Sequence, residues 1–327
     1  MEYLKHHLSI PEQVELLKKR GLEAEDTLLA TRLKNVGYYR LSAYLHPFRI
    51  RDELGKISDE YTPGTTLDKV WLYYSFDRKF RFMMLDAIER IEVALRSRIA
   101  YYHTQERSPF AYASADYFPK WKGYIQGLDR LKIQKDKHGK AITKGKDSID
   151  HFFNTYGDKH DYLPLWIAVG EMDFGTVVHF YTHSEKVIKK AIAGEWNIDT
   201  SSLESWLNTL RMLRNDCAHH ARIWNKTFQS LPRMNNTPNL PWNYVYSDKA
   251  KKWVKPTNSL MDNKSMLDSQ NTLAAHLFIC RYLLKQIAPT SEWHIRMQNF
   301  LIKFQQQGIP LSKIGLPEYW ENHPMWI

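Results

Sequence analysis

Residues 210–225 concentrate side chains that can hold a phosphate and move a proton. An arginine can stabilise the charge that develops on a phosphate, and an imidazole titrates close to neutral pH and can act as an acid or a base. With the 2′-hydroxyl of RNA as the nucleophile, these two groups are enough to cleave RNA without a metal ion. The candidate polar residues of the segment are Arg211, Arg214, Asn215, Asp216, His219, His220 and Arg222.

A straight helix over this segment separates its polar and apolar side chains. At about 100° per residue, Leu210, Leu213, Cys217, Ala221 and Trp224 cluster on one side, whereas Arg211, Asn215, His219 and Arg222 form a polar stripe on the other. On this helix Arg214 lies about 140° from His219. Three arrangements stay open: Arg214 curls round, the helix is distorted, or a second chain completes the site. Asp216 and His220, at i and i+4, can form a supporting hydrogen-bonded pair.

The Arg-to-His spacing is not specific by itself, because roughly one such pair is expected by chance. Arg98 and His103 repeat the spacing and Arg40 and His46 have a related one; we interpret both as coincidences and leave a second site at Arg98 and His103 open. His179 and His183 stand at i and i+4, but no acidic ligand is fixed nearby. We therefore predict no metal site and no cofactor. The phosphate-binding, nucleophile-elbow and zinc-protease motifs are missing from the sequence.

The segment resembles a known family together with its surroundings. RNDCAHH (214–220) is similar to the Arg-x₄-His signature of HEPN ribonucleases, and its setting resembles the Abi family of bacterial abortive-infection proteins, the AbiD/AbiF type. The blocks that carry this resemblance are NVGYYRLSAY (35–44), FDRKFR (76–81), AIERIEVALR (87–96), PLWIAVGEMDFG (164–175) and GLPEYW (315–320).

The resemblance implies an all-helical HEPN-like bundle, a role in phage defence, and RNA as the ligand. It implies that Arg214, Asn215 and His219 are catalytic, with Asp216, His220, Arg211 and Arg222 in support. HEPN proteins commonly pair so that two motifs face one another, which implies a homodimer. AbiF-type relatives are thought to associate with a small non-coding RNA, so a bound structured RNA can be a guide, an antitoxin or a scaffold. The leading hypothesis is a metal-independent endoribonuclease; the alternative is a non-catalytic RNA-binding protein that forms a ribonucleoprotein.

Charge supports a polyanionic ligand. The chain has 46 Lys and Arg against 36 Asp and Glu, a formal net charge of +10. Residues 120–146 hold much of the excess, and their glycines, with Trp121 and Tyr124 interleaved, predict a mobile basic arm that tracks a phosphate backbone; a solvated loop is the alternative. Its candidate RNA-binding residues are Lys120, Lys122, Arg130, Lys132, Lys135, Lys137, Lys140, Lys144 and Lys146.

The elements that must position these residues are predicted to be helices. Between Phe76 and Tyr102 apolar residues recur every three or four positions, which indicates one long helix. Acid–base pairs at i and i+4 are expected to support it from the surface; these are Asp77/Arg81, Asp86/Arg90 and Glu92/Arg96. Near the N-terminus, Ser9 and Pro11 indicate a helix start, Gly21 its end, and Asp26 the cap of the next helix.

Further helices are expected over 37–44, 163–182, 203–224 with a Ser201 or Ser202 cap, 272–288, and 292–307. No strand–helix–strand alternation is visible, so the fold class is all-α. We expect residues 1–70 to form an N-terminal helical region packed on a HEPN-like domain over 71–327, with insertions at 120–146 and 232–266. The sequence has no apolar run of 18 residues, no apolar leader and only two cysteines, which predicts a cytoplasmic protein without membrane spans.

Overall fold

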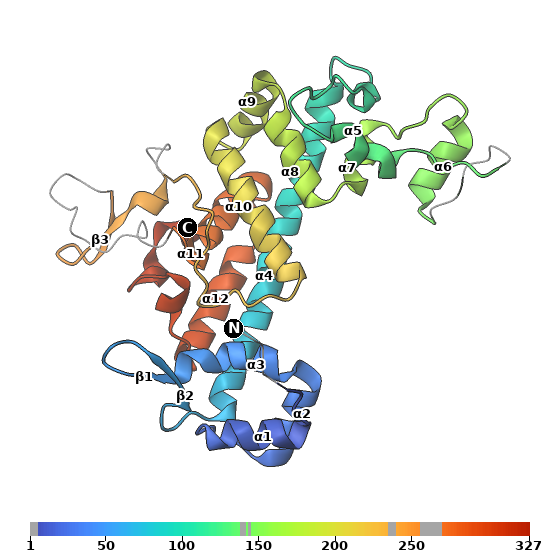
Figure 1. Ribbon diagram of the computed structural model, residues 1–327. Coiled ribbons are helices and arrows are strands. Elements are labelled where there is room, and N and C mark those ends of the chain that lie inside the picture. Colours follow the sequence, from blue (N-terminus) through green and yellow to red (C-terminus); the bar gives the residue numbers. More distant parts are fainter. Residues whose placement is uncertain (1–5, 138–141, 143–144, 235–239, 256–269) are drawn as a thin grey trace.

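Helices dominate the computed structural model, which describes residues 6–137, 142, 145–234, 240–255 and 270–327 (Figure 1). The helices are α1 (Ile10–Lys19), α2 (Asp26–Val36), α3 (Tyr38–Leu45), α4 (Leu67–Thr104), α5 (Tyr124–Leu128), α6 (Asp147–Tyr156), α7 (Leu165–Glu171), α8 (Phe174–His183), α9 (Lys186–Glu195), α10 (Thr200–Ala218), α11 (Leu273–Ile287) and α12 (Trp293–Gln306). Two small antiparallel hairpins accompany them, β1 (Arg49–Arg51) with β2 (Ile57–Tyr61) and β3 (Val245–Ser247) with β4 (Lys252–Val254). The predicted all-α fold is confirmed.

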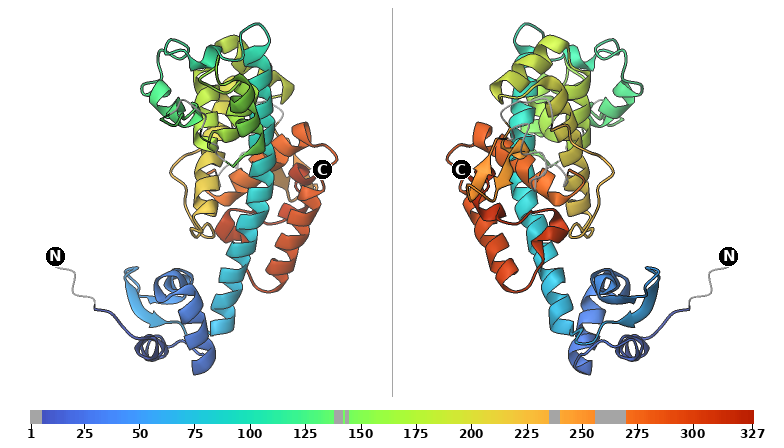
Figure 2. Two further views of the ribbon diagram at one scale, coloured as in Figure 1. Left: turned by 90° about the vertical axis from the view of Figure 1, so that its right-hand side faces the viewer. Right: turned by 90° about the vertical axis from the view of Figure 1, so that its left-hand side faces the viewer.

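Helix α4 is the axis of the molecule. It packs against α3, α7, α8, α9, α10, α11 and α12, and Figure 2 shows it running from the N-terminal helices at one end to α8 and α9 at the other. The predicted apolar stripe is buried, with Phe80, Met84, Ile88, Ile91 and Leu95 all fully inaccessible to solvent. The long amphipathic helix is therefore confirmed, and it extends beyond both predicted ends.

The N-terminal helices begin close to where their caps predict. Ser9 and Glu12 form a capping box at the start of α1, where Pro11 occupies the first turn. For α2 the predicted cap is wrong by one residue, because the carboxylate of Glu25, not Asp26, accepts the N–H groups of Thr27 and Leu28. Together with the β1–β2 hairpin, α1 to α3 gather at one end of α4, and α4 itself continues without a break across residue 70.

Two predicted helices have different limits in the structure. The helix expected over 163–182 is broken between α7 and α8, since Met172 is extended and the Asp173 carboxylate caps α8 by accepting the Thr176 N–H. The helix expected over 203–224 starts earlier, at Thr200, with Asp199 as its cap instead of a serine, and ends at Ala218. The second correction changes the geometry of the candidate site.

The predicted basic arm is partly a folded structure. Residues 138–141 and 143–144 lie outside the described residues. In the described part, Tyr124, Leu128 and Leu131 are buried, and the partly buried Trp121 packs against the His183 ring, with centroids 5.1 Å apart. These aromatic side chains face the protein, so the expectation that they lie on a mobile arm is wrong.

The described part of the second predicted excursion, 232–266, also packs on the core. Residues 235–239 and 256–266 of it lie outside the described residues. Trp242 is fully buried, and Trp253 in β4 donates its indole N–H to the carbonyl of Tyr319 at 3.0 Å. This hairpin therefore covers the C-terminal segment.

Candidate functional site

The candidate motif lies at the C-terminal end of α10, where the helix stops. His219 caps the helix through its N–H, which donates to the carbonyl of Asn215 at 2.9 Å. His220 has a positive φ of 58°, a left-handed conformation that terminates helices. The Ala221 N–H then donates to the carbonyl of Asp216 at 2.8 Å. The two histidines therefore form a turn, and residues 221–224 leave the helix.

A buried carboxylate holds the chain that follows the turn. Asp77 of α4 is fully buried, and its Oδ1 accepts the N–H groups of Ile223 at 3.1 Å and Trp224 at 2.7 Å. Its Oδ2 accepts the hydroxyl of Tyr44 at 2.6 Å and pairs with the guanidinium of Arg81. Burial raises the pKa of Asp77, while these donors favour its ionised form. The prediction that Asp77 and Arg81 form a surface pair is wrong.

Arg81 reaches the same stretch of chain. The residue is 4% exposed, and its guanidinium donates to the carbonyl of Ala221 at 3.1 Å in addition to its ion pair with Asp77. A buried cation of this kind needs both an anion and hydrogen-bond acceptors. Together, Asp77 and Arg81 bond to backbone groups of three residues within 221–224, which fixes the exit of the histidine turn on α4.

Two arginines connect the turn and α3, one donating from α3 to the turn and the other from the turn to α3. Arg40 of α3 donates to the carbonyl of His220, and Arg222 donates to the carbonyl of Ala43 at 2.7 Å. Arg222, predicted as a supporting residue of the site, thus fastens α3. The spacing of Arg40 from His46 gives no sign of this role, yet the fold brings Arg40 to His220. In the sequence, Arg40 can be singled out by its position in the block 35–44 that carries the family resemblance, and not by its spacing from a histidine.

The three predicted catalytic residues do not share one set of contacts. Arg214 is partly exposed, and its Nε lies 4.0 Å from a carboxylate oxygen of Glu92 on α4. Asn215 and His219 are exposed. Within the described part of the chain, no hydrogen bond or ion pair joins the side chain of Arg214 to that of His219. The described chain by itself therefore does not join the arginine of the motif to its histidine.

The other predicted supporting residues have partners of their own. Asp216 pairs with Lys226, their atoms 2.5 Å apart, rather than with His220. Arg211 donates through Nε and Nη2 to the amide oxygen of Asn208, at 3.2 Å and 2.9 Å. His220 is exposed. The fold therefore gathers His219 and His220 at the turn, with Asp216 and Arg211 engaged along α10.

The predicted RNA-binding lysines are far from this turn. Figure 1 places α5 and α6 near the end of α4 opposite α3, whereas the turn contacts Asp77 and Arg81 in the first half of α4. Lys120, Lys122, Lys132, Lys135, Lys137 and Lys146 are exposed. Lys146 pairs with Glu171, and Lys135 lies 3.9 Å from Asp161. Lys140 and Lys144 lie outside the described residues, and of Arg130 only the backbone is described.

His103 and Arg98 do not form a second copy of the motif. His103 is buried, its ring nitrogens lying 2.7 Å from the Tyr117 hydroxyl and 2.8 Å from the Ser184 hydroxyl. Burial lowers the pKa of His103 to about 3, so this imidazole is neutral. Arg98 pairs instead with Glu195 at 2.6 Å. The repeat of the spacing is therefore a coincidence of sequence.

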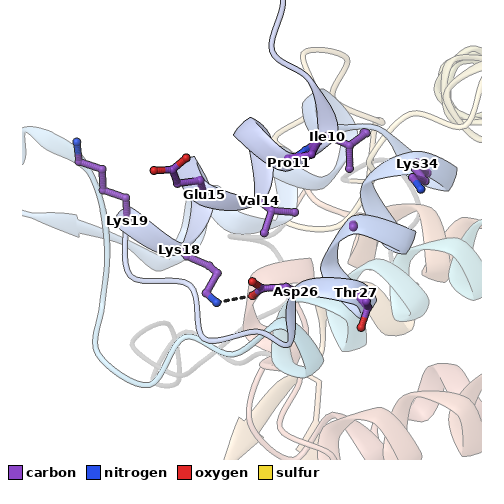
Figure 3. Close-up of a pocket in the computed structure, with 10 residues that line it drawn as sticks. Ile10, Pro11, Val14, Glu15, Lys18, Lys19, Asp26, Thr27 and Lys34 are labelled. Atoms are coloured by element: carbon purple, nitrogen blue, oxygen red, sulfur yellow. Dashed lines mark hydrogen bonds and ion pairs between the residues drawn. The ribbon is translucent and has the colours of Figure 1, made fainter.

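The other candidates for a ligand site are a metal centre and a hollow between α1 and α2. Among the described residues no three His, Cys, Asp or Glu side chains converge on a metal site, and His183 bonds through Nδ1 to the carbonyl of His179 at 2.9 Å. A hollow of about 870 Å³ lies between α1 and α2. Figure 3 shows the Lys18–Asp26 ion pair at its edge. Its lining holds no histidine or cysteine in the described chain, so it does not extend the candidate chemistry.

The fold and the turn define a class: a helical protein that presents an Arg-Asn-x₃-His motif at an exposed helix end, anchored from behind by a buried carboxylate. The sequence matches the family of Abi-like proteins over residues 31–225, more than half of the chain, so the protein belongs to this family. The matched region runs from α2 through the turn to Asn225 and includes Arg40, Asp77 and Arg81. Membership points to abortive infection, a defence against phage.

Comparisons with curated proteins and with solved structures found no further match. In the part of the chain that the structure describes, no helix is both long and apolar enough to cross a membrane.

Proposed function

We propose that this protein is a phage-defence endoribonuclease of the HEPN type that cleaves RNA without a metal ion. One observation carries the proposal: the turn that ends α10 presents His219 to solvent, while Asp77 and Arg81 hold its exit rigidly. A catalytic base must be both accessible and fixed in position. His219 is the proposed acid or base, and Asn215 the group that orients the phosphate or the imidazole.

The separation of Arg214 from His219 supports a site built from two chains. In one chain Arg214 faces Glu92 and α4, so a second copy is the proposed source of the cation opposite His219. Large apolar side chains are exposed on α4 and on α7, which packs against α4: Val93, next to Glu92, is 53% exposed and Trp166 is 56% exposed. Exposed apolar groups favour burial in an interface. We propose a homodimer on this face.

The proposed chemistry needs only groups of the protein and of the RNA. His219 accepts the proton of a 2′-hydroxyl, whose oxygen attacks the adjacent phosphorus and forms a 2′,3′-cyclic phosphate as the 5′-oxygen leaves. The leaving oxygen takes up a proton from an imidazolium, by this proposal that of the partner's motif. Arg214 stabilises the additional negative charge of the pentavalent phosphate.

A second candidate is a non-catalytic ribonucleoprotein with a structured small RNA. It is favoured by the position of Arg214, whose Nε lies 4.0 Å from a carboxylate of α4 while no bond in the described chain joins Arg214 to His219. The exposed lysines of 120–146 supply a second cationic surface for a long RNA in either case.

Purification from the native host distinguishes the two candidates. We expect a discrete RNA to co-purify and the wild-type protein to leave 2′,3′-cyclic phosphate ends in the presence of EDTA. His219→Ala should lose cleavage and retain RNA affinity, with His7→Ala, an exposed histidine in the N-terminal segment, as control. Intact RNA with wild type and His219→Ala alike favours the ribonucleoprotein, and protein free of RNA that also leaves added RNA intact contradicts both.

A further inference from the structure

A second pocket opens beside the histidine turn. It measures about 430 Å³ and lies between α2, α3, α4 and the end of α10. Its walls include Arg40, Arg78, Tyr74, Phe82 and His220. Binding sites for small ligands typically occupy about 300–1,000 Å³, so this pocket has room for a single nucleotide.

The pocket is cationic. Arg40, Arg78 and Arg81 contribute guanidinium groups, and none of its described lining residues is an aspartate or glutamate. Arg81 is neutralised by Asp77 behind the wall, and Arg40 is oriented by its bond to the His220 carbonyl. Arg78 is exposed, and within the described chain no ion pair engages it. Unopposed arginines in a concave site attract a phosphate.

Aromatic rings form part of the wall. Tyr74 is partly buried and fixed by ring contacts with Tyr44, at 5.4 Å between centroids, and Trp71, at 4.7 Å. Phe82 is 61% exposed, with the Arg78 guanidinium 5.9 Å from its ring centroid. An exposed phenylalanine beside a cation is the combination on which single-stranded nucleic-acid-binding proteins stack bases.

From this lining we infer that the pocket is a subsite for one unpaired nucleotide of RNA. Arg40 and Arg78 bind the phosphate, and the base stacks on Tyr74 or Phe82. Because His220 lines the pocket, the bound nucleotide lies next to the histidine turn. A base-paired nucleotide cannot enter such a pocket without leaving its stack, so the substrate is single-stranded at this point. The inference rests on the RNA-binding part of the proposed function, not on cleavage.

The test measures binding instead of cleavage, with full-length His219→Ala protein and a short single-stranded oligoribonucleotide. Phe82→Ala should weaken binding by about 5- to 100-fold, the range for removal of one stacked base. Arg78→Ala should weaken it and reduce the slope of log K against log salt concentration by about 0.7, the value for one neutralised phosphate on a single strand. The matched controls on α4 are Tyr101→Ala, another exposed aromatic residue, and Lys79→Ala, another exposed cation.

The outcomes separate this inference from the proposed function. Weaker binding in the pocket variants than in the controls supports the subsite, whether or not the wild type cleaves RNA. Equal binding by all four variants overturns the subsite and leaves the proposed function standing. Protein that binds no RNA overturns both. A nucleoside monophosphate that binds in the pocket and is not displaced by the oligoribonucleotide assigns the pocket to a free nucleotide and overturns the RNA subsite.

Discussion

Asp77 accepts the backbone N–H of Trp224 at 2.7 Å across 147 residues of sequence, and this bond fixes the chain on the far side of the two histidines. The same carboxylate binds Tyr44 of α3 and Arg81 of α4. One buried carboxylate thus joins α3, α4 and the chain after α10, which all lie in the region that matches the family of Abi-like proteins. The position of His219 depends on it although the two side chains do not touch.

Asp77→Asn should destabilise the protein strongly. The substitution keeps the size of the side chain but leaves Arg81 buried without an anion, which typically costs about 3–5 kcal/mol. Urea unfolding measures the decrease in stability. The control is Asp86→Asn, which removes a partly exposed partner of Arg90 and Arg296 and should cost about 1 kcal/mol or less for each pair. Equal effects of the two variants would show that Asp77 is not an anchor.

Glu92→Gln should strengthen binding of RNA. Glu92 pairs with Arg96 and lies 4.0 Å from the Nε of Arg214, so removing its charge leaves both guanidinium groups less neutralised and should raise the affinity for a phosphate by about 1 kcal/mol, or about fivefold. Fluorescence anisotropy at two salt concentrations checks this result. Glu60→Gln, an exposed carboxylate in β2, is the control. Unchanged affinity in Glu92→Gln would argue against Arg214 as a phosphate ligand.

Mild acid should destabilise the fold through buried histidines. Burial lowers the pKa of His103 and His323 to about 3 and that of His276 to about 4. Since an unfolded histidine titrates near 6.5, the unfolded state binds more protons below this pH, and stability falls as the pH is lowered from about 6.5 toward 4. At pH 5.5 each histidine costs about 1.4 kcal/mol. Urea unfolding at pH 7.5 and 5.5 measures the difference.

His103→Gln is the matched variant for this experiment. It removes one of the three imidazoles whose pKa values are lowered furthest, so the loss of stability between pH 7.5 and 5.5 should shrink by about 1.4 kcal/mol. Substituting the exposed His151 by glutamine should leave the pH dependence unchanged. A fold that is equally stable at both pH values would contradict the burial of neutral imidazoles.

Neutralising the exposed lysines of 120–146 should weaken RNA binding without affecting cleavage chemistry. A variant with Lys120, Lys122 and Lys137 changed to glutamine should show a flatter salt dependence, by about 0.7 for each phosphate of a single strand that the protein no longer neutralises. The control changes Lys19, Lys34 and Lys190, which are equally exposed, to glutamine. If both triple variants bind alike, residues 120–146 form a solvated surface and not an RNA-binding one.

The sequence predicts the elements better than it predicts their limits. The apolar stripe of α4 can be recognised in the sequence because one face of the helix is buried along its whole length. The start of α1 can be recognised because Ser9, Pro11 and Glu12 are local signals. The end of α10 cannot be predicted from the sequence, because it depends on the left-handed conformation of His220 and on long-range bonds to Asp77. The helical spacing of apolar residues continues through this turn, although the helix itself ends at Ala218.

For the candidate site, sequence patterns locate the motif but not its support. The spacing of Asp77 and Arg81 fits an exposed helical pair as well as a buried one, and only tertiary structure distinguishes them. Arg40 has no local pattern at all, since its acceptor is 180 residues away. The sequence predicts Trp121 and Tyr124 on a mobile basic arm, yet aromatic residues in a basic segment are equally suited to attach it to the core.

The paired bonds of Arg40 and Arg222 make α3 and the histidine turn move as one unit. A displacement of α3 breaks the bond to the His220 carbonyl and the bond to Ala43 together. A ligand that binds more tightly when α3 is docked on the turn would therefore also favour the ordered turn, and by reciprocity a ligand of the ordered turn would favour docked α3. The N-terminal helices thus take part in holding the candidate site, through the bonds of Arg40 and Arg222.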